Sequence, residues 1–124
     1  MILATVGNHT QAFDRLIRAI DNIAPTISEE ILIQVGISRY KPVNAAYFGF
    51  VGESEMDQLM GQASMIISHS GVASLLKAIF LRKPTIIVPR LKRFGEHIDD
   101  HQLELATRLS HLRGIKVVDD TASL

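Results

Sequence analysis

The sequence predicts a doubly wound α/β domain built on one parallel β-sheet, and three observations support this. Short apolar runs alternate with longer stretches whose apolar residues lie three and four positions apart, the pattern of strands and amphipathic helices. Each short run is apolar at all but one position, as in strands buried on both faces of a parallel sheet. The chain has 124 residues, 47% of them hydrophobic, which suffices for one core and excludes a two-domain enzyme.

The apolar runs predict six strands, over residues 2–6, 31–35, 46–50, 65–68, 85–88 and 115–118. Apolar stripes predict four helices between them, over residues 13–23, 56–63, 72–80 and 98–112. Ser54 and Asp57 have capping-box spacing ahead of the second helix, and Lys83 and Pro84 end the third. In such a fold, ligands bind at the carboxyl ends of the strands. With no closing helix after the last strand, the single domain, 1–124, is expected to be shortened at its C-terminus.

Composition excludes several classes of function. The formal net charge is zero, which argues against a nucleic-acid partner, although residues 63–124 hold nine Lys and Arg against six Asp and Glu. The absence of cysteine excludes disulfides and thiolate metal sites. No apolar run approaches the roughly 20 residues of a membrane span, and no signal peptide is visible. A soluble cytoplasmic protein is therefore expected.

Two strand-to-helix junctions carry polar residues that could bind a ligand. The first, TVGNHT over residues 5–10, has one turn glycine, Gly7, and is far from a dinucleotide-binding fingerprint. The second, SHSGVAS over residues 68–74, combines a small-residue turn with a helix start, which favours an anion such as phosphate. The structural alternative is that Ser70 caps the helix and His69 is a turn histidine. A hydrolase elbow would need glycine where Ser68 and Val72 stand.

The third junction, residues 89–102, places three cations before a cluster of acids, histidines and an amide. His97 and His101 are four apart and are predicted to share a helix face, with Asp100 between them as in inverted zinc-protease motifs. Aspartate is shorter than the glutamate of those motifs, and no third ligand stands out, so we expect no metal. A solvated helix start remains the alternative. Such side chains also read sugar hydroxyls, and Arg90, Lys92 or Arg93 can offset diphosphate charge.

A diphosphate cradle beside a hydroxyl-reading cluster points to a nucleotide sugar. The segments VGNHTQAFDRL, SHSGVAS and VPRLKRFGEHIDDHQLE resemble the three landmarks of the C-terminal domain of family 28 glycosyltransferases. The resemblance is greatest to the E-type subunits of two-component capsule and exopolysaccharide glycosyltransferases. It extends to the catalytic subunits that add the second N-acetylglucosamine in eukaryotic lipid-linked oligosaccharide assembly. It implies the donor-binding half of an inverting GT-B enzyme, with a UDP-sugar as substrate and no metal or other cofactor in the donor site.

The resemblance also implies site residues and partners. The expected donor-binding residues are Gly7, Asn8, His69, Ser70, Gly71, Val72, Ser74, Arg90, Glu96, His97, His101 and Gln102. His9 and Glu96 are the candidate catalytic residues, and the base could instead come from a partner. That partner would be a membrane-anchored D-type subunit that brings this chain to the inner face of the membrane and to a lipid-linked saccharide acceptor.

Departures from the family pattern keep alternatives open. Ser70 replaces a usual glycine, Asp99 stands where asparagine is common, and Lys77 stands where the wider family has a ribose-binding glutamate. One rival function is a noncatalytic subunit that only stabilises its partner. The other is a stand-alone phosphate-binding hydrolase. The sequence does not identify the sugar or the linkage.

Overall fold

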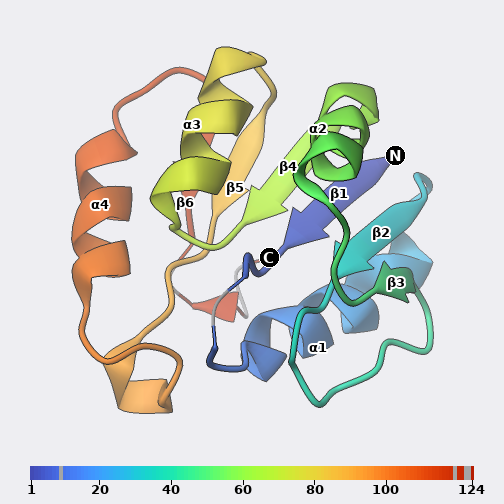
Figure 1. Ribbon diagram of the computed structural model, residues 1–124, viewed down its shortest axis with the longest axis horizontal. Coiled ribbons are helices and arrows are strands. Elements are labelled where there is room, and N and C mark those ends of the chain that lie inside the picture. The colour runs from blue at the N-terminus through green and yellow to red at the C-terminus, as the bar shows by residue number, and fades with distance from the viewer. Residues whose placement is uncertain (9, 119, 122–123) are drawn as a thin grey trace.

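A computed structural model describes residues 1–8, 10–118, 120–121 and 124 of the chain. Figure 1 shows strands and helices alternating along it. The elements are β1 (Ile2–Thr5), α1 (Asp14–Ile23), the 3₁₀ turn η1 (Ala24–Thr26), β2 (Ile31–Gln34), β3 (Ala46–Phe48), α2 (Glu53–Gln62), β4 (Met65–Ser68), α3 (Val72–Phe80), β5 (Thr85–Ile87), the 3₁₀ turn η2 (Lys92–Phe94), α4 (His101–Leu109) and β6 (Ile115–Val117).

The strands form one six-stranded sheet in the order β3-β2-β1-β4-β5-β6, and every adjacent pair is parallel. β1 lies near the centre, paired with β2 on one side and with β4 on the other. The chain builds outward from β1 to β3 and then returns to start the other half at β4. The gap between the ends of β1 and β4 is therefore the topological switch point, where open α/β sheets bind ligands. The predicted doubly wound α/β fold is confirmed.

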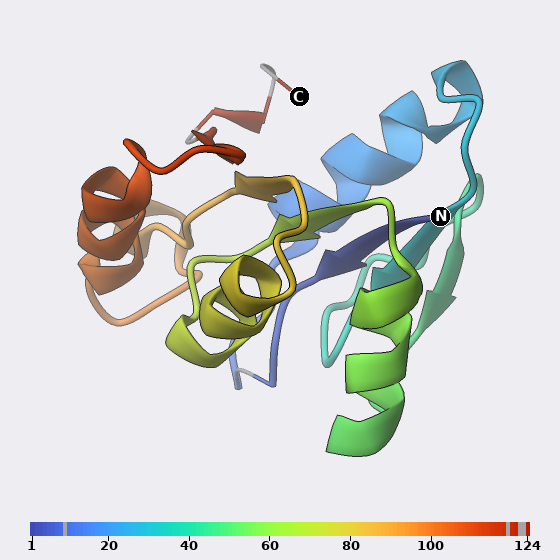
Figure 2. The same cartoon turned by 90° about the horizontal axis from the view of Figure 1, so that it is seen from above.

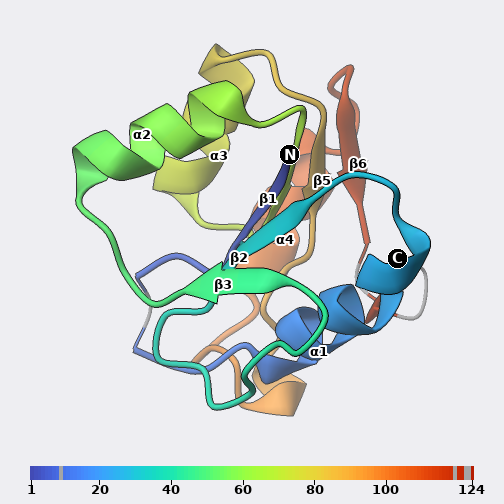
Figure 3. The same cartoon turned by 90° about the vertical axis from the view of Figure 1, so that its right-hand side faces the viewer.

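Helices cover both faces of the sheet. Figures 2 and 3 show α1 on one face, with α2 and α3 on the other. Under α1, Phe13, Leu16, Ile17 and Ile20 pack on the apolar side chains of β1 and β2. On the opposite face, α2 and α3 bury Met60 and Ala78 against Leu3 and Ile66. α4 closes the β5–β6 side through Ala106. The strand positions were predictable because these strands are apolar on both sides.

Two helix starts differ from the prediction. α2 begins at Glu53 with Gly52 as its N-cap, so the predicted capping box at Ser54 and Asp57 is wrong; both residues lie inside the helix. Glu53 and Glu55 instead place negative charge in the first turn, which favours a helix N-terminus.

α4 begins at His101, three residues later than predicted, because its approach is held by local hydrogen bonds. Asp99 Oδ1 accepts from the backbone N–H of His101 at 2.9 Å, and Asp100 Oδ1 accepts from that of Lys92 at 3.0 Å. Hydrogen bonds from the backbone to such short polar side chains compete with the backbone hydrogen bonds of a helix. His97 therefore precedes the helix, and the prediction that His97 and His101 share one helix face is wrong.

Candidate functional site

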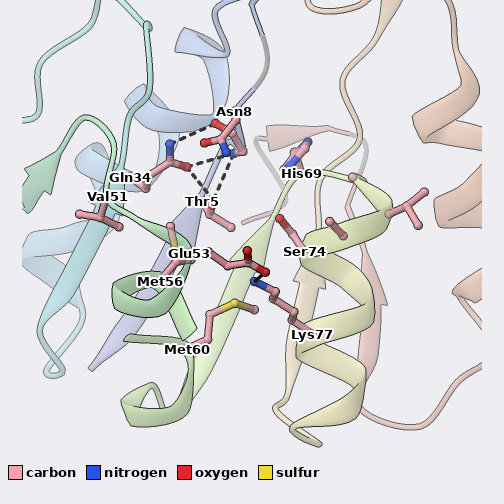
Figure 4. A pocket seen from close by; sticks show the side chains of 14 residues that line it. Thr5, Asn8, Gln34, Val51, Glu53, Met56, Met60, His69, Ser74 and Lys77 are labelled. Carbon is pink, nitrogen blue, oxygen red and sulfur yellow. Dashed lines mark hydrogen bonds and ion pairs between the residues drawn. The ribbon is translucent and has the colours of Figure 1, made fainter. Parts of the chain in front are cut away.

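A pocket of about 410 Å³ lies at the topological switch point. Its floor is made by the carboxyl ends of β1 and β2 and the turn after β4, and its walls by α2 and α3 (Figure 4). The lining residues are Thr5, Gly7, Asn8, Gln34, Val51, Glu53, Met56, Met60, His69, Gly71, Val72, Ala73, Ser74 and Lys77. Six of the predicted donor-binding residues line it together: Gly7, Asn8, His69, Gly71, Val72 and Ser74.

The His69 imidazole fits between two glycines from different junctions. A Cβ atom on Gly7 would lie 2.3 Å from Nε2 of His69, and one on Gly71 would lie 2.3 Å from Cε1. Gly7 also has a φ of +73°, a conformation that L side chains rarely adopt. Only glycine fits at either position while the ring stays in place. His69 is buried, and the first two junctions are thereby packed against each other.

Gln34 fixes the first junction, and the sequence analysis missed it. Its Oε1 accepts from Thr5 Oγ1 at 2.6 Å, from Val6 N at 3.1 Å and from Gly7 N at 3.0 Å. Its Nε2 donates to the carbonyls of Gly7 at 3.0 Å and Gly49 at 3.1 Å. Gln34 is only 1% exposed and thus holds three segments with one amide. The sequence feature that could have revealed Gln34 is an amide side chain at the end of an apolar strand, because a buried polar group needs hydrogen-bond partners.

The second junction presents the N-terminus of α3 to the pocket. Gly71 is the N-cap, and no side chain caps the helix, so the alternative in which Ser70 caps α3 is wrong. Ser70 is 2% exposed, and within the described part of the chain its Oγ has no hydrogen-bond partner. The first turn of α3 contains no acid that would neutralise the helix dipole. The N–H groups of the first turn and the positive end of α3 favour an anion in the pocket, whereas Ser70 is not among the described residues that line it.

An ion-pair cluster closes the side of the pocket between α2 and α3. Lys77 Nζ lies 2.6 Å from Asp57 Oδ1 and 3.4 Å from Glu53 Oε1. The hydrogen bond to Asp57 is the main cause that raises the pKa of Lys77, so it is protonated at neutral pH. The Glu53 side chain is 82% exposed (Figure 4). Glu53 therefore gives the pocket an accessible carboxylate beside Lys77, the lysine that α3 contributes.

Gln102, at the end of the third junction, contacts His69 in the wall of this pocket. Its Nε2 lies 3.2 Å from Nδ1 of His69, and its Oε1 accepts from the backbone N–H of Arg90 at 3.1 Å. Gln102 therefore supports the imidazole that the two glycines enclose. It connects α4 to the second junction.

Arg90 and Glu96 are placed in the scaffold instead of in the pocket. The Arg90 guanidinium is 0% exposed and donates to the carbonyls of Val6 at 2.7 Å, Gln11 at 2.8 Å, Ala12 at 3.4 Å and Glu96 at 3.2 Å. Burial lowers its pKa to about 10, against the opposing effect of Glu96, so it stays charged at neutral pH. This geometry does not bring Arg90 to a diphosphate in the pocket.

The Glu96 carboxylate is also occupied. Both oxygens accept from Arg15, at 2.9 and 3.0 Å, and Oε1 also accepts from Leu91 N at 3.1 Å. Glu96 is 4% exposed. Its role as a catalytic residue stays a prediction with no support from this arrangement.

His97 and His101 lie on either side of Asp99, at the same edge of the sheet. The Nδ1 atoms of the two rings are 3.0 and 3.1 Å from the two carboxylate oxygens. His9, the other catalytic candidate, lies outside the described residues. The structure thus joins the first two junctions in one pocket and places the third beside it.

The model of the glycosyltransferase family 28 C-terminal domain matches residues 1–120. The chain belongs to this family. The match covers all three junctions, so the family 28 prediction is confirmed; the bacterial E-type assignment stays a prediction.

Curated relatives of this family 28 domain include UDP-N-acetylglucosamine transferase subunits ALG13. The subunit of Candida albicans is 30% identical over 77 residues, which is 62% of this chain and 25% of that protein. The subunit of Yarrowia lipolytica is 33% identical over 76 residues, 61% of this chain and 37% of that protein. The chain thus matches well under half the length of these relatives.

Solved structures similar to this family 28 domain are glycosyltransferases. The glycosyltransferase of kitacinnamycin superposes with a TM-score of 0.74 at 16% identity, over 99% of this chain and 31% of that one. The calicheamicin glycosyltransferase CalG4 gives 0.70 at 15% identity, over 94% and 29%. These likenesses show the fold. Among the described residues of the present chain, no helix has the length and apolar character needed to cross a membrane.

Proposed function

We propose that this chain is the donor-binding subunit of an inverting glycosyltransferase that takes its sugar from a UDP-sugar. The observation that carries the proposal is the pocket at the switch point, which Gly7, Gly71 and the N-terminus of α3 line together. Its volume is in the range of small-molecule sites. The name of the ALG13 relatives, which are UDP-N-acetylglucosamine transferase subunits, supports a UDP-sugar.

Each part of the donor has a chemically matching region. The diphosphate would bind at the start of α3, where Gly71 and Ser74 line the pocket and offer backbone amides and a hydroxyl. Glu53 offers a carboxylate for ribose hydroxyls. The sugar would extend toward the edge formed by residues 97–102. No metal is needed at this donor site because the helix end itself favours the negative charge that develops on UDP.

The reaction would be a single displacement. The acceptor hydroxyl attacks the anomeric carbon, the bond from that carbon to the β-phosphate oxygen breaks, and UDP leaves with the electron pair. The proton goes to a general base, for which His9 or a partner residue is the candidate. The acceptor would be a lipid-linked saccharide, as in capsule or exopolysaccharide synthesis, with dolichol-type oligosaccharide assembly as the alternative.

A second subunit would supply the acceptor half. This domain covers about 30% of the solved glycosyltransferases that it resembles, and its relatives are named as subunits. We propose a membrane-anchored D-type partner that recruits this chain to the cytoplasmic face of the membrane. A noncatalytic subunit that only stabilises its partner is the second candidate, because Lys77 lines the pocket and forms ion pairs with Asp57 and Glu53. Sugar transfer by the reconstituted pair, and none by the partner alone, would exclude it.

Calorimetry with UDP tests donor binding. Gly71→Asp places a carboxylate at the anion site and against His69, so binding should fall by more than ten-fold. Gly52→Asp is the matched control, since it adds the same charge at the N-cap of α2 with nothing within 4 Å of its Cβ. Equal UDP affinity in wild type and a folded Gly71→Asp would contradict the proposal.

A further inference from the structure

A second cavity, of about 370 Å³, lies at the amino ends of β5 and β6. The turn from α3 into β5 forms one wall, and the turn from α4 into β6 forms the other; both turns lie at the same end of the sheet in Figure 1. The backbone N–H of Thr85 donates to the carbonyl of Gly114 at 2.8 Å and links the two turns. Because every adjacent pair of strands is parallel, this cavity and the donor pocket lie at opposite edges of the sheet.

Two arginines line this second cavity without a partner. Arg82 comes from the first turn and Arg113 from the second, and both are exposed. Within the described part of the chain, neither guanidinium makes a hydrogen bond or an ion pair. The third cation, Lys83, is already engaged, since its Nζ donates to the carbonyls of Gly61 at 2.9 Å and Ala63 at 2.8 Å. The two arginines are therefore the charged groups available to a ligand.

The charge of the surrounding chain favours an anion in this cavity. Residues 58–95 and 105–118, which include both turns, contain no Asp or Glu. None of the described residues that line the cavity is acidic. Cations that no carboxylate neutralises produce a positive potential, which low-dielectric walls concentrate. Ile79, Leu112 and Ile115 supply such walls.

The backbone at Arg82 shows that its side chain is not needed to end α3. Arg82 has a φ of +56°, and among the described residues it is the one non-glycine with a positive φ. Its N–H donates to Ile79 O at 3.0 Å, and that of Lys83 donates to Ala78 O at 3.1 Å. In this C-terminal motif, glycine is the usual residue at the position of Arg82. Glycine can therefore replace Arg82 without strain.

We propose that this cavity is a second ligand site, which binds the phosphate group of an organic phosphate monoester. Such a group has three terminal oxygens, so one phosphate can accept hydrogen bonds from the guanidinium groups of both Arg82 and Arg113. The apolar walls match the organic part of the ligand. Its source is either a soluble phosphate ester or the headgroup of a phospholipid. This inference does not depend on the proposed function, because the donor pocket lies at the other edge of the sheet.

Amide ¹H–¹⁵N spectra titrated with phenyl phosphate at constant ionic strength test the site. The signals of residues 82, 83, 113 and 114 should shift together and saturate, whereas sodium chloride should not reproduce the shifts. Inorganic phosphate should shift the same signals with weaker affinity, because it lacks an apolar part. Shifts confined to residues 69–74 would place the ligand in the donor pocket alone and would overturn the proposal.

Three variants show whether the two arginines hold the phosphate. Arg82→Gly removes one guanidinium and should fold at least as well as wild type. It should weaken phenyl phosphate by about ten-fold or more, the effect of losing a charge-assisted hydrogen bond, and Arg113→Gln should do the same. Arg108→Gln is the matched control, because it removes the same charge from an exposed residue of α4 outside the cavity. Equal affinity in wild type and Arg82→Gly, or an equal loss in Arg108→Gln, would overturn the assignment.

Sedimentation with phosphatidylcholine vesicles, with and without phosphatidic acid, identifies the source of the phosphate. A lipid headgroup predicts sedimentation only with phosphatidic acid, weakened by Phe80→Ser, because Phe80 is 85% exposed two residues before Arg82 and would enter the membrane. A soluble ester predicts no sedimentation and unchanged phenyl phosphate binding in Phe80→Ser. Either result supports the site. The absence of both phenyl phosphate binding at this cavity and sedimentation that requires phosphatidic acid would overturn it, whereas a failure to bind UDP would contradict only the proposed function.

Discussion

Single residues decide the shape of the pocket, because its loops are held by side chains that bind backbone. Gln34 makes four such hydrogen bonds and a fifth to the Thr5 hydroxyl, and His69 fills the space that Gly7 and Gly71 leave open. A polar side chain that is saturated in this way leaves several groups unpaired when it is removed. The shape of the first junction therefore depends on the Gln34 side chain.

Gln34→Leu should lower the free energy of unfolding by about 2–4 kcal/mol, since Val6 N and Gly7 O would lose their hydrogen bonds to Gln34, while Gly7 N keeps Thr5 Oγ1 and Gly49 O keeps Gly36 N. Urea unfolding followed by circular dichroism measures it. Gln58→Leu, on the exposed side of α2, is the control and should change stability by less than about 0.5 kcal/mol. A Gln34→Leu chain as stable as wild type would show that Gln34 is not the residue holding this junction.

At the scale of elements, Asp21 joins α1 to the segment before β3. The carboxylate is buried and accepts from the backbone N–H groups of residues 43, 44 and 45 at 3.0, 2.7 and 3.1 Å, and from the Tyr40 hydroxyl at 2.7 Å. Burial acts to raise the pKa of Asp21, but the hydrogen bonds together outweigh it and lower the pKa below its usual 3.8. This loop therefore depends on an ionised group.

The lowered pKa of Asp21 makes the stability of the folded chain depend on pH. Asp21 contributes stability at pH values above 3.8, where it is ionised both folded and unfolded, and this contribution is lost as the pH falls through the lower folded pKa. Asp21→Asn should cost about 2–3 kcal/mol at pH 7 and less at pH 3. Thermal unfolding at both pH values measures the difference. A destabilisation that is the same at pH 3 and pH 7 would show that the charge has no part in holding the loop.

The elements were largely predictable, whereas the contacts that place their ends were not. Each of the first five strands contains two or three consecutive apolar residues, and the stripes of α1 and α3 follow the helical period. The ends of α2 and α4 depend on Gly52, Asp99 and Asp100, whose local hydrogen bonds a hydrophobic pattern does not reveal. The sequence predicts Arg90 at a phosphate because exposed cations follow it closely in the chain. Its partners are instead carbonyls far away in the sequence, which a local pattern does not reveal.

For the whole molecule, Arg90 connects the two halves of the sheet. It follows β5, yet it donates to the carbonyl at the end of β1 and to those of the segment leading into α1. Arg90 also donates to the carbonyl of Glu96, in the segment between β5 and α4. The buried Arg90 guanidinium thus links β5 to the end of β1 at the edge of the sheet that carries the pocket.

Arg90→Lys should lower the free energy of unfolding by about 3–5 kcal/mol, because one ammonium cannot replace two guanidinium nitrogens that serve four carbonyls. Arg93→Lys, an exposed change in η2, is the control and should be near neutral. Differential scanning calorimetry compares them. Similar melting temperatures for both variants would refute this role of Arg90.

The position of β1 near the centre of the sheet also sets the order in which the protein can fold. Ile2 pairs with Ile31 on one side and with Met65 on the other, so the second pairing closes a loop about twice as long. Until β4 arrives, β1 has an unpaired apolar edge that another chain can add to. Closing long loops slows parallel sheets, and slow closure prolongs exposure of that edge. The switch point that houses the pocket is therefore also the strand pairing that closes the longest loop of the sheet, and we expect high protein concentration during refolding to favour aggregation at that step.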